Sequence, residues 1–427
     1  MTSMVRTSCL RIVTSHFPYG DHDEFMSEEL GYLARAFDEI ILTPLSPRGS
    51  EEVWDVPTSV SVDTSLASAL SRKIGPVPPI AARWARRTYH SLRPRSTSML
   101  TTLAAPDDWT SGPVLWAASV VREVGDYATI HRWALLQSRP SVTYTFWLGP
   151  ATAALANAWA GVPVVSRAHG GDLYAYSRRP TGIPLQTRAI DASWATRSVS
   201  RHGAEYLRQR HPTAAAKIGV SHLGIRLPDV LTSRSGDGLV RVLSASSVDD
   251  NKRVRFIHEV VRELQRLAMS PIVWTHFGDG PAMDDLRKSI AKTPVSNLRV
   301  DLVGRVPVQH VRDHFAREPV DLFINASRSE GMPISVMEAQ SFGVACLAPD
   351  VGGVAEVAPP SLNAIVTASS SPRDYALAGV RLLGCQADQR ADRRDHFRAN
   401  FEAAAVYGEW SRKLASLTVS RRTWDEL

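Results

Sequence analysis

The chain has 427 residues, two to three times the usual length of one domain, so we expect two domains of roughly 200 residues each. Its 49 Lys and Arg residues against 43 Asp and Glu residues give a net charge of +6, and 44% hydrophobic with 22% charged residues excludes a disordered chain. Spread over this length, the charge of +6 is weak evidence for nucleic-acid binding, and we predict no nucleic-acid partner.

The first part of the chain alternates short apolar runs with helical patterns, which is typical of βαβ units around a parallel sheet. The expected strands are residues 10–15, 39–45, 141–147 and 162–169. The expected helices are residues 24–37 and 150–161. This order predicts a doubly wound α/β domain.

One stretch of this first part has a lopsided charge. Residues 64–106 contain no acidic residue, whereas basic residues recur along them. Ile80 and Trp84 lie four positions apart, and Arg83 and Arg87 follow at helical spacing on another face. Such a helix can lie on an anionic membrane surface, or it can be a solvated basic helix with Trp84 packed on the domain. The sequence leaves both interpretations open.

A second series of strands is expected at residues 239–246, 272–280, 298–304 and 321–327. Each strand ends in small or polar residues, and open α/β sheets bind ligands at the carboxyl ends of their strands. Between the two series, residues 227–238 are rich in Pro, Ser, Gly and Asp and lack apolar periodicity. This composition predicts an interdomain linker.

Residues 325–357 carry the most informative pattern. After the expected strand, a loop leads to Pro333, which stands at the expected first position of a helix, where proline loses no hydrogen bond. Gly343 is the expected stop. The start of such a helix presents free amides and a partial positive charge, which favour a bound phosphate.

Two carboxylates flank this expected anion site. Glu330 precedes the helix, and Glu338 lies within it, where it can accept two hydrogen bonds from a vicinal diol such as ribose. Because carboxylates repel a bare phosphate unless they face hydroxyls, the segment fits a sugar nucleotide better than a phosphate. The alternative is a surface helix with two incidental glutamates.

Glu330 and Glu338 are separated by seven residues within SRSEGMPISVMEAQSFGVACLAP, which VGGVAEV follows. This segment resembles the E-x7-E motif of the retaining GT-B glycosyltransferases of glycosyltransferase family 4. The resemblance implies an α/β fold with two Rossmann-like, doubly wound parallel-sheet domains that face each other across a cleft. It also implies that Glu330 contacts donor-sugar hydroxyls and that Glu338 holds the nucleotide ribose. The loop residues that would bind the diphosphate and the sugar are Gly331, Met332, Pro333 and Ile334.

A second segment, SASSVDDNKRVRFI, resembles the family segment whose lysine binds the donor diphosphate, here Lys252. Where many members carry a Gly-Arg pair, this chain has Ala245 and Ser246, and Arg253 is the candidate for the missing charge. An ammonium on a flexible stem suits a point contact to a diphosphate, which favours Lys252. The alternative is a pair of solvated basic residues that open a helix.

Further segments match in the order that the resemblance implies. Gly304 and Arg305, in DLVGRVP, are candidates for backbone contacts to the nucleobase, and a plain tight turn is the alternative. Gly20 lies in the first loop, which approaches the diphosphate in exopolysaccharide-type members, and glycine allows a close backbone approach. His169 ends an expected strand beside the cleft and is the candidate catalytic residue for acceptor or sugar contacts, with Asp172 as a nearby substrate-binding residue.

The same resemblance assigns the domains. Residues 1–226 form an acceptor domain, 227–238 the linker and 239–404 a nucleotide-sugar domain. Residues 405–427 form a last helix that crosses back to the first domain.

The resemblance predicts a hexosyltransferase that needs no metal and no cofactor, with Glu330 and Lys252 at its centre. It would move a sugar from a nucleotide-diphosphate sugar, a UDP-sugar before a GDP-sugar, to a hydroxyl of a glycan or lipid-linked glycan in bacterial surface or extracellular polysaccharide synthesis. The subgroup that it resembles is the exopolysaccharide and colanic-acid type. DHD at residues 21–23 is literally a DxD, but it lacks the context of a GT-A metal site.

Two other functions are alternatives. The first is a GT-B protein that binds nucleotide sugar or glycan without turnover, which Ser246 in place of arginine motivates. The second, a nicotinamide-dependent dehydrogenase, is disfavoured because neither domain has a GxGxxG after its first strand.

The remaining features bear on location. No apolar run reaches the ~18–20 residues of a spanning helix, and the N-terminus lacks the apolar core of a secretory signal. The three cysteines include no CxxC pair, which favours a reducing compartment. We therefore predict a cytoplasmic protein, with peripheral association at the inner face of the plasma membrane as the hypothesis that the basic stretch adds.

Overall fold

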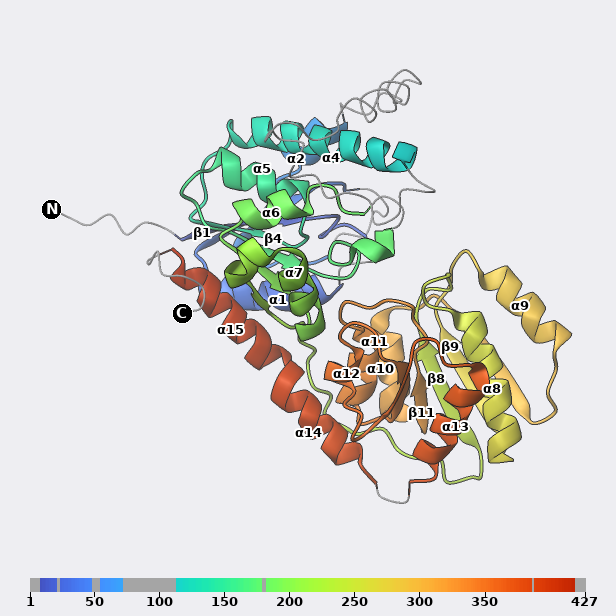
Figure 1. The fold of residues 1–427 in the computed structure, drawn as a ribbon. Coiled ribbons are helices and arrows are strands. Elements are labelled where there is room, and N and C mark those ends of the chain that lie inside the picture. The colour runs from blue at the N-terminus through green and yellow to red at the C-terminus, as the bar shows by residue number, and fades with distance from the viewer. Residues whose placement is uncertain are drawn as a thin grey trace. The chain divides into compact units, whose positions relative to one another are not determined.

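The computed structural model describes residues 8–20, 24–47, 54–71, 113–178, 182–385 and 388–418. The chain divides into two compact units, which are built around separate sheets (Figure 1). The first unit combines Met1–Gly224 with Ala404–Leu427, and the second is Ile225–Ala403.

In the described part of the first unit, seven strands form one parallel sheet. In spatial order they are β3 (Val60–Val62), β2 (Glu39–Pro44), β1 (Cys9–Thr14), β4 (Val142–Thr145), β5 (Val164–Ala168), β6 (Ala195–Ser198) and β7 (Ile218–Val220). β1 pairs with β2 on one side and with β4 on the other, so the strand order reverses between β1 and β4. This is the doubly wound arrangement that the sequence predicts.

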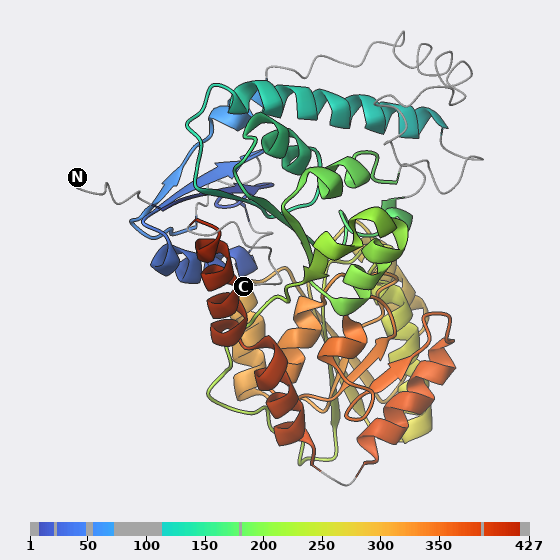
Figure 2. The same ribbon diagram turned by 60° about the vertical axis from the view of Figure 1, so that its left-hand side comes forward.

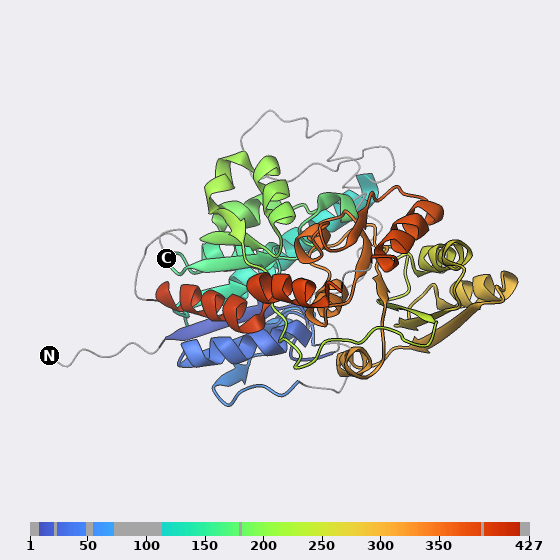
Figure 3. The same cartoon turned by 90° about the horizontal axis from the view of Figure 1, so that it is seen from below.

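Helices cover both faces of this sheet, because successive side chains of a buried strand point to opposite faces. Leu10 and Ile12 of β1 pack with α1 (Glu24–Ala36) and with α15 (Ala403–Ser416), which lie side by side (Figure 3). Val13 packs on the other face with α2 (Ser65–Ser71), α4 (Pro113–Ala134) and α5 (Pro150–Ala158) (Figure 2). Among the described residues of this unit, the remaining helical segments are η1 (Ala175–Arg178), α6 (Gln186–Ala192), α7 (Arg201–Arg210) and η2 (Pro212–Lys217).

In the second unit, the described residues form a parallel sheet of six strands. In spatial order they are β10 (Leu298–Gly304), β9 (Ile272–Phe277), β8 (Val240–Ala245), β11 (Leu322–Ile324), β12 (Cys346–Pro349) and β13 (Ala364–Val366). β8 pairs with β9 and with β11, so this sheet reverses its strand order between β8 and β11. The chain therefore has two doubly wound parallel sheets, as predicted.

The apolar sides of the second sheet are covered by helices. Ile257, Val261 and Leu264 of α8 (Val254–Ala268) pack with α13 (Pro372–Leu383) and α9 (Met283–Lys292) in one core. Elsewhere Phe315 of α10 (Val308–Arg317) stacks on Phe342, with ring centroids 5.3 Å apart. The other helices that the structure describes in this unit are α11 (Ile334–Ser341), α12 (Val354–Val357) and α14 (Arg390–Phe401).

Residues 227–238, the predicted linker, fall within the second unit and are hydrogen-bonded to other parts of it. The hydroxyl of Thr232 donates to the carbonyl of Phe315 at 2.6 Å, and the amide of Ser235 donates to Asp321 at 3.0 Å. Polar contacts therefore hold this segment in place. The helix predicted from residue 405 begins at Ala403, and its Trp410 is buried in the core of the first unit.

Two features singled out in the sequence fall outside the described residues, namely DHD at 21–23 and the part of the basic stretch from residue 72 onward. Among the residues that the structure describes, none of the helices combines the length and the apolar composition that crossing a membrane requires.

Candidate functional site

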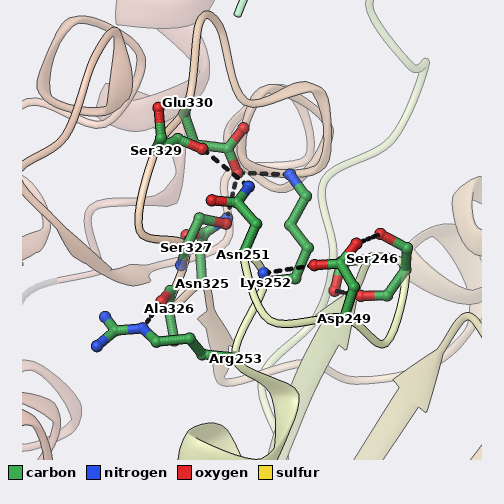
Figure 4. A network of polar contacts seen from close by, with 11 residues as sticks. Ser246, Asp249, Asn251, Lys252, Arg253, Asn325, Ala326, Ser327, Ser329 and Glu330 are labelled. Atoms are coloured by element: carbon green, nitrogen blue, oxygen red, sulfur yellow. Dashed lines mark hydrogen bonds and ion pairs between the residues drawn. The ribbon is translucent and has the colours of Figure 1, made fainter. Parts of the chain in front are cut away.

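Lys252 and Glu330, 78 residues apart in sequence, form an ion pair in which Nζ of Lys252 lies 2.7 Å from Oε1 of Glu330 (Figure 4). Lys252 lies in the loop after β8, and Glu330 lies in the loop after β11. Because β8 and β11 are parallel neighbours at the point where the strand order reverses, their carboxyl ends bring these loops together. The Lys252 side chain remains 26% exposed, whereas that of Glu330 is 9% exposed.

Main-chain contacts hold these two loops against each other. The amide of Arg328 donates to the carbonyl of Asn251 at 2.8 Å, and the Asn251 side-chain amide donates to the carbonyl of Ser329 at 3.1 Å. Within the first loop, Oδ1 of Asp249 accepts the amide of Lys252 at 2.8 Å. The ammonium and the carboxylate are therefore presented by a preformed pair of loops.

Arg253 follows Lys252 directly but points away from the ion pair (Figure 4). Its backbone is left-handed, with φ of 50°, immediately before α8 begins. Its Nε donates to the carbonyl of Ala326, and its guanidinium lies 4.6 Å from the ring centroid of Phe256. The sequence made Arg253 a substrate-binding candidate; in the structure its side chain joins the two loops.

Asn325 is a member of this cluster that the sequence analysis missed. Its Nδ2 donates to Oε1 of Glu330 at 3.3 Å, and its Oδ1 accepts the amide of Ser327 at 2.9 Å. The available signal was its place, since it is the first residue after the apolar run of β11. Asn325 thus orients the Glu330 carboxylate and shapes the loop that carries it.

The predicted helix after this loop is α11. Pro333 precedes its first residue by one position, with ψ of 96°, and its carbonyl accepts the amides of Val336 and Met337. The sequence analysis expected Pro333 at the first helical position. In the structure its extended ψ places it one residue before the helix. Gly331 and Met332 are buried, Ile334 is half-buried, and the first amides of a helix have no partner within it.

Glu338 is buried on α11 at 5% exposure. α11 is anchored by Gln340, whose side-chain amide exchanges two hydrogen bonds of 3.0 Å with that of Asn363. The predicted stop is present: Gly343 follows the helix with φ of 79°.

Gly304 ends β10 and has φ of 87°, and its carbonyl accepts the amide of Gly278 at 2.8 Å. Arg305 follows it at the same carboxyl edge of the sheet as Lys252, two strands further along. The Gly304 carbonyl is therefore already engaged by the neighbouring loop.

Three of the sequence candidates lie in the first unit. Gly20 follows β1 with φ of 83°, and its carbonyl accepts Nε1 of Trp54 at 2.7 Å. His169 directly follows β5, as expected, and it is buried, with only 6% of the residue exposed. Burial and the nearby Arg167 hold the pKa of His169 well below its usual range, which keeps the imidazole neutral. Burial raises the pKa of Asp172 to about 7.

Residues 240–385 match the family model described as Glycosyl transferases group 1. The match covers about a third of the chain. It contains Lys252, Glu330 and Glu338, so the ion pair and the α11 carboxylate lie within the group 1 segment.

Two curated proteins are similar to parts of the chain. One is TuaC of Bacillus subtilis, named for a glycosyltransferase role in teichuronic acid biosynthesis, which is 26% identical over 206 residues, 48% of this chain and 51% of TuaC. The other is one subunit of a phosphatidylinositol N-acetylglucosaminyltransferase of Arabidopsis thaliana, 29% identical over 145 residues, 34% of this chain and 31% of that protein. The chain thus spans about half or less of the relatives that it matches.

Solved structures resemble the whole chain in fold. The lipopolysaccharide outer core galactosyltransferase WaaB has a TM-score of 0.63 at 12% identity, covering 96% of this chain and 99% of WaaB. A TarM variant of S. aureus, in complex with Fondaparinux, alpha-GlcNAc-glycerol and UDP, has a TM-score of 0.64 at 11% identity over 97% of this chain and 100% of its own. Anabaena HepE in complex with UDP-glucose has a TM-score of 0.57 at 13% identity, covering 96% of this chain and 99% of HepE. With its two Rossmann-like sheets, the chain has the GT-B fold.

Proposed function

We propose that the protein is a retaining glycosyltransferase that moves a sugar from a UDP-sugar to a hydroxyl of a glycan or lipid-linked glycan. The observation that carries this proposal is the pairing of Lys252 with Glu330 at the strand-order reversal of the group 1 segment. The GT-B fold and the family of this segment support it.

In this proposal, the chemistry at the donor is mainly electrostatic. Departure of the nucleotide diphosphate develops negative charge, which the Lys252 ammonium and the first amides of α11 stabilise where it appears. Glu330 accepts hydrogen bonds from donor-sugar hydroxyls, Glu338 accepts them from the ribose, and the leaving phosphate assists attack by the acceptor hydroxyl on the same face. The scheme assigns no step to a metal or a cofactor.

The acceptor and the pathway belong to the proposal as well. The names of the relatives, which refer to teichuronic acid and lipopolysaccharide, support a role in bacterial surface polysaccharide synthesis. A UDP-sugar is favoured over a GDP-sugar because solved structures of the same fold contain UDP or UDP-glucose.

A panel of UDP- and GDP-sugars tests the donor. We expect one UDP-sugar to raise the unfolding temperature, because a ligand at 100 times its Kd adds about 2.7 kcal/mol of stability. Radiolabel transfer from that donor should fall at least tenfold in Lys252→Ala and in Glu330→Gln, while Glu263→Gln, at an exposed α8 ion pair, serves as the matched control.

Wild-type transfer rates in both site variants would refute the assignment. Stabilisation by a donor without hydrolysis or transfer would instead support a GT-B protein that only binds. Ser246 favours this second candidate, since its hydroxyl donates to the carbonyl of Ser247 where many members present a guanidinium.

Peripheral attachment to an anionic inner membrane face completes the proposal. It rests on the charge of residues 64–106, most of which lie outside the described residues. Flotation with anionic liposomes should recover the wild-type chain, and neutral substitutions of Arg83, Arg86 and Arg87 together should abolish recovery. If the wild-type chain does not bind the liposomes, the proposed membrane attachment is refuted.

A further inference from the structure

Asp172 lies between the two loops that follow β4 and β5 in the first unit. Its Oδ2 accepts the backbone amide of Leu148 at 2.7 Å, and its Oδ1 accepts the backbone amide of His169 at 2.7 Å. The residue is 5% exposed, so these two short bonds form away from competing water. Both oxygens of the carboxylate are therefore engaged by main chain.

The two amides come from neighbouring strands. β4 and β5 pair in parallel, with Thr145 opposite Ser166, so their loops leave the same edge of the sheet. A single carboxylate bridges these loops, and a side chain with one acceptor oxygen cannot replace it.

The bridge fixes the surroundings of the His169 ring. The ring packs against both Phe146 and Trp147 of the loop after β4, with centroids 4.4 Å and 4.5 Å away. Because Asp172 holds the amide of Leu148, next to Trp147, and the amide of His169 itself, it sets the position of the imidazole against these two aromatic rings.

The main chain of Asp172 is anchored from the opposite side. Nε2 of Gln186 on α6 donates to the carbonyls of Asp172 and Leu173, at 2.8 Å and 2.9 Å. Gln186 is 1% exposed, so this anchor is also shielded from water. The main chain that carries the carboxylate is therefore held in place by Gln186.

From this geometry we infer that Asp172 is a positioning residue that acts through His169, and that it does not contact the sugar or the acceptor itself. The inference deepens the proposed function, on which its kinetic test rests. It replaces the substrate-binding role that the sequence suggested for Asp172 with a structural one.

Amide hydrogen exchange tests the bridge without any substrate. In Asp172→Asn, one of the two amides faces an NH2 group, which cannot accept its hydrogen. We expect at least one of the amides of Leu148 and His169 to exchange at least tenfold faster, while the strand amide of Thr143, bonded to Pro163, keeps its wild-type rate. Glu205→Gln, at an exposed bond on α7, is the matched control.

Unchanged exchange at Leu148 and His169 would overturn the inference. If Asp172→Asn does not fold, amide hydrogen exchange of the wild-type chain still tests the bridge. The amides of Leu148 and His169 must then exchange at least a hundredfold more slowly than that of exposed Gly171, and equal rates would overturn the inference.

A double-mutant cycle tests whether Asp172 acts through His169. We expect Asp172→Asn to lower transfer kcat/KM for the acceptor at least tenfold in the wild-type background, but less than twofold in His169→Ala. The Kd for UDP should stay unchanged in both. An equal loss in both backgrounds would show direct contact with substrate and overturn the inference. Absence of transfer by the wild-type chain would refute the proposed function, and hydrogen exchange would still decide the role of Asp172.

Discussion

Arg167 and Glu29 are 138 residues apart in sequence, yet they form a fully buried ion pair, with Nη1 of Arg167 2.7 Å from Oε2 of Glu29. Nη2 of Arg167 donates to the hydroxyl of Ser221 at 2.8 Å, and its guanidinium lies 4.2 Å from the ring centroid of Trp410. The pair therefore joins β5, α1, the segment after β7 and α15 into one core.

Removing the charge of Glu29 should lower the stability of the first unit more than removing the charge of Arg167. Glu29→Gln leaves a buried guanidinium, which cannot lose its proton, so we expect a loss of about 3–5 kcal/mol in stability of the first unit. Arg167→Met leaves Glu29, and burial already raises the pKa of that carboxyl, so it can become neutral by taking up a proton. We expect a smaller loss, measured by denaturant unfolding together with amide exchange of β1 and β5.

The pH dependence of Arg167→Met follows from the same shift. A raised folded-state pKa contributes stability that is present at low pH and is lost as pH rises through that pKa. Lowering the pH from 8 to 6 should therefore stabilise Arg167→Met relative to the wild type. If Glu29→Gln costs less than Arg167→Met at pH 8, the ion pair does not have the role assigned to it.

A close approach of two backbones makes Gly278 the most constrained glycine in the described part of the second unit. Its φ is 135°, and a Cβ there would lie 1.8 Å from the carbonyl oxygen of Ser246. Gly304→Ala is the matched control, because φ there is also positive at 87° but no atom lies within 4 Å of the added carbon.

We expect Gly304→Ala to lower the stability of the second unit by about 1–2 kcal/mol, the cost of a left-handed backbone. Gly278→Ala should cost about 3 kcal/mol or more, because overpacking adds to backbone strain. Chemical denaturation of both variants measures the difference. Equal losses would mean that the loop after β8 yields to the added carbon.

Much of the fold could be predicted from local pattern. Buried parallel strands are apolar along their length, so Ile12 in β1 and Phe323 in β11 lie in runs that the sequence displays. Turn chemistry also placed the end of α11 at Gly343. These signals are local, since they depend on what a residue's neighbours in sequence allow.

Pairing over long distances could not be predicted. Nothing in the sequence links Arg167 with Glu29, because their contact depends on which strand lies beside which helix. Motif resemblance singled out Lys252 and Glu330 but gave no contact between them, and it offered no sign of Asn325. The direction of the Arg253 side chain, toward Ala326, depends on a left-handed backbone that no motif encodes.

His276 of β9 should make the second unit sensitive to acid. The imidazole is fully buried, and its Nδ1 lies 2.9 Å from the hydroxyl of Ser244, which also accepts Nε1 of Trp274. The Ser244 hydroxyl can donate its hydrogen to Nδ1 only while the imidazole ring is neutral, since both ring nitrogens of an imidazolium carry hydrogens. Burial lowers the pKa of His276 to about 4 from the ordinary 6.5.

Because the unfolded chain binds this proton more readily than the folded one, stability is lost as pH falls from about 6.5 toward 4. At pH 5 the loss due to His276 is about 2 kcal/mol relative to pH 7.5. His276→Asn keeps a polar group at the Nδ1 position but does not titrate, so its stability should fall less over this range. Identical losses in the wild type and in His276→Asn, measured by denaturant unfolding at both pH values, would contradict the prediction.

Glu330 should have opposite effects on nucleotide binding and on sugar transfer. In the ligand-free protein its carboxylate neutralises the ammonium of Lys252, so a diphosphate must displace Glu330 or tolerate it nearby. Glu330→Gln frees that charge, and we expect UDP to bind about three- to tenfold more tightly, consistent with an ion pair of about 1 kcal/mol at a partly exposed site. Transfer should still fall at least tenfold, because the amide is a weaker acceptor for sugar hydroxyls.

Titration calorimetry with UDP at two salt concentrations measures this effect. The gain in affinity should shrink as salt rises, because screening weakens the contact between ammonium and diphosphate. Lys252→Ala provides the opposite limit, with weaker UDP binding and little dependence on Glu330. If Glu330→Gln weakens UDP binding as Lys252→Ala does, Glu330 serves mainly to hold the ammonium in place, and the two residues act as one unit toward the diphosphate.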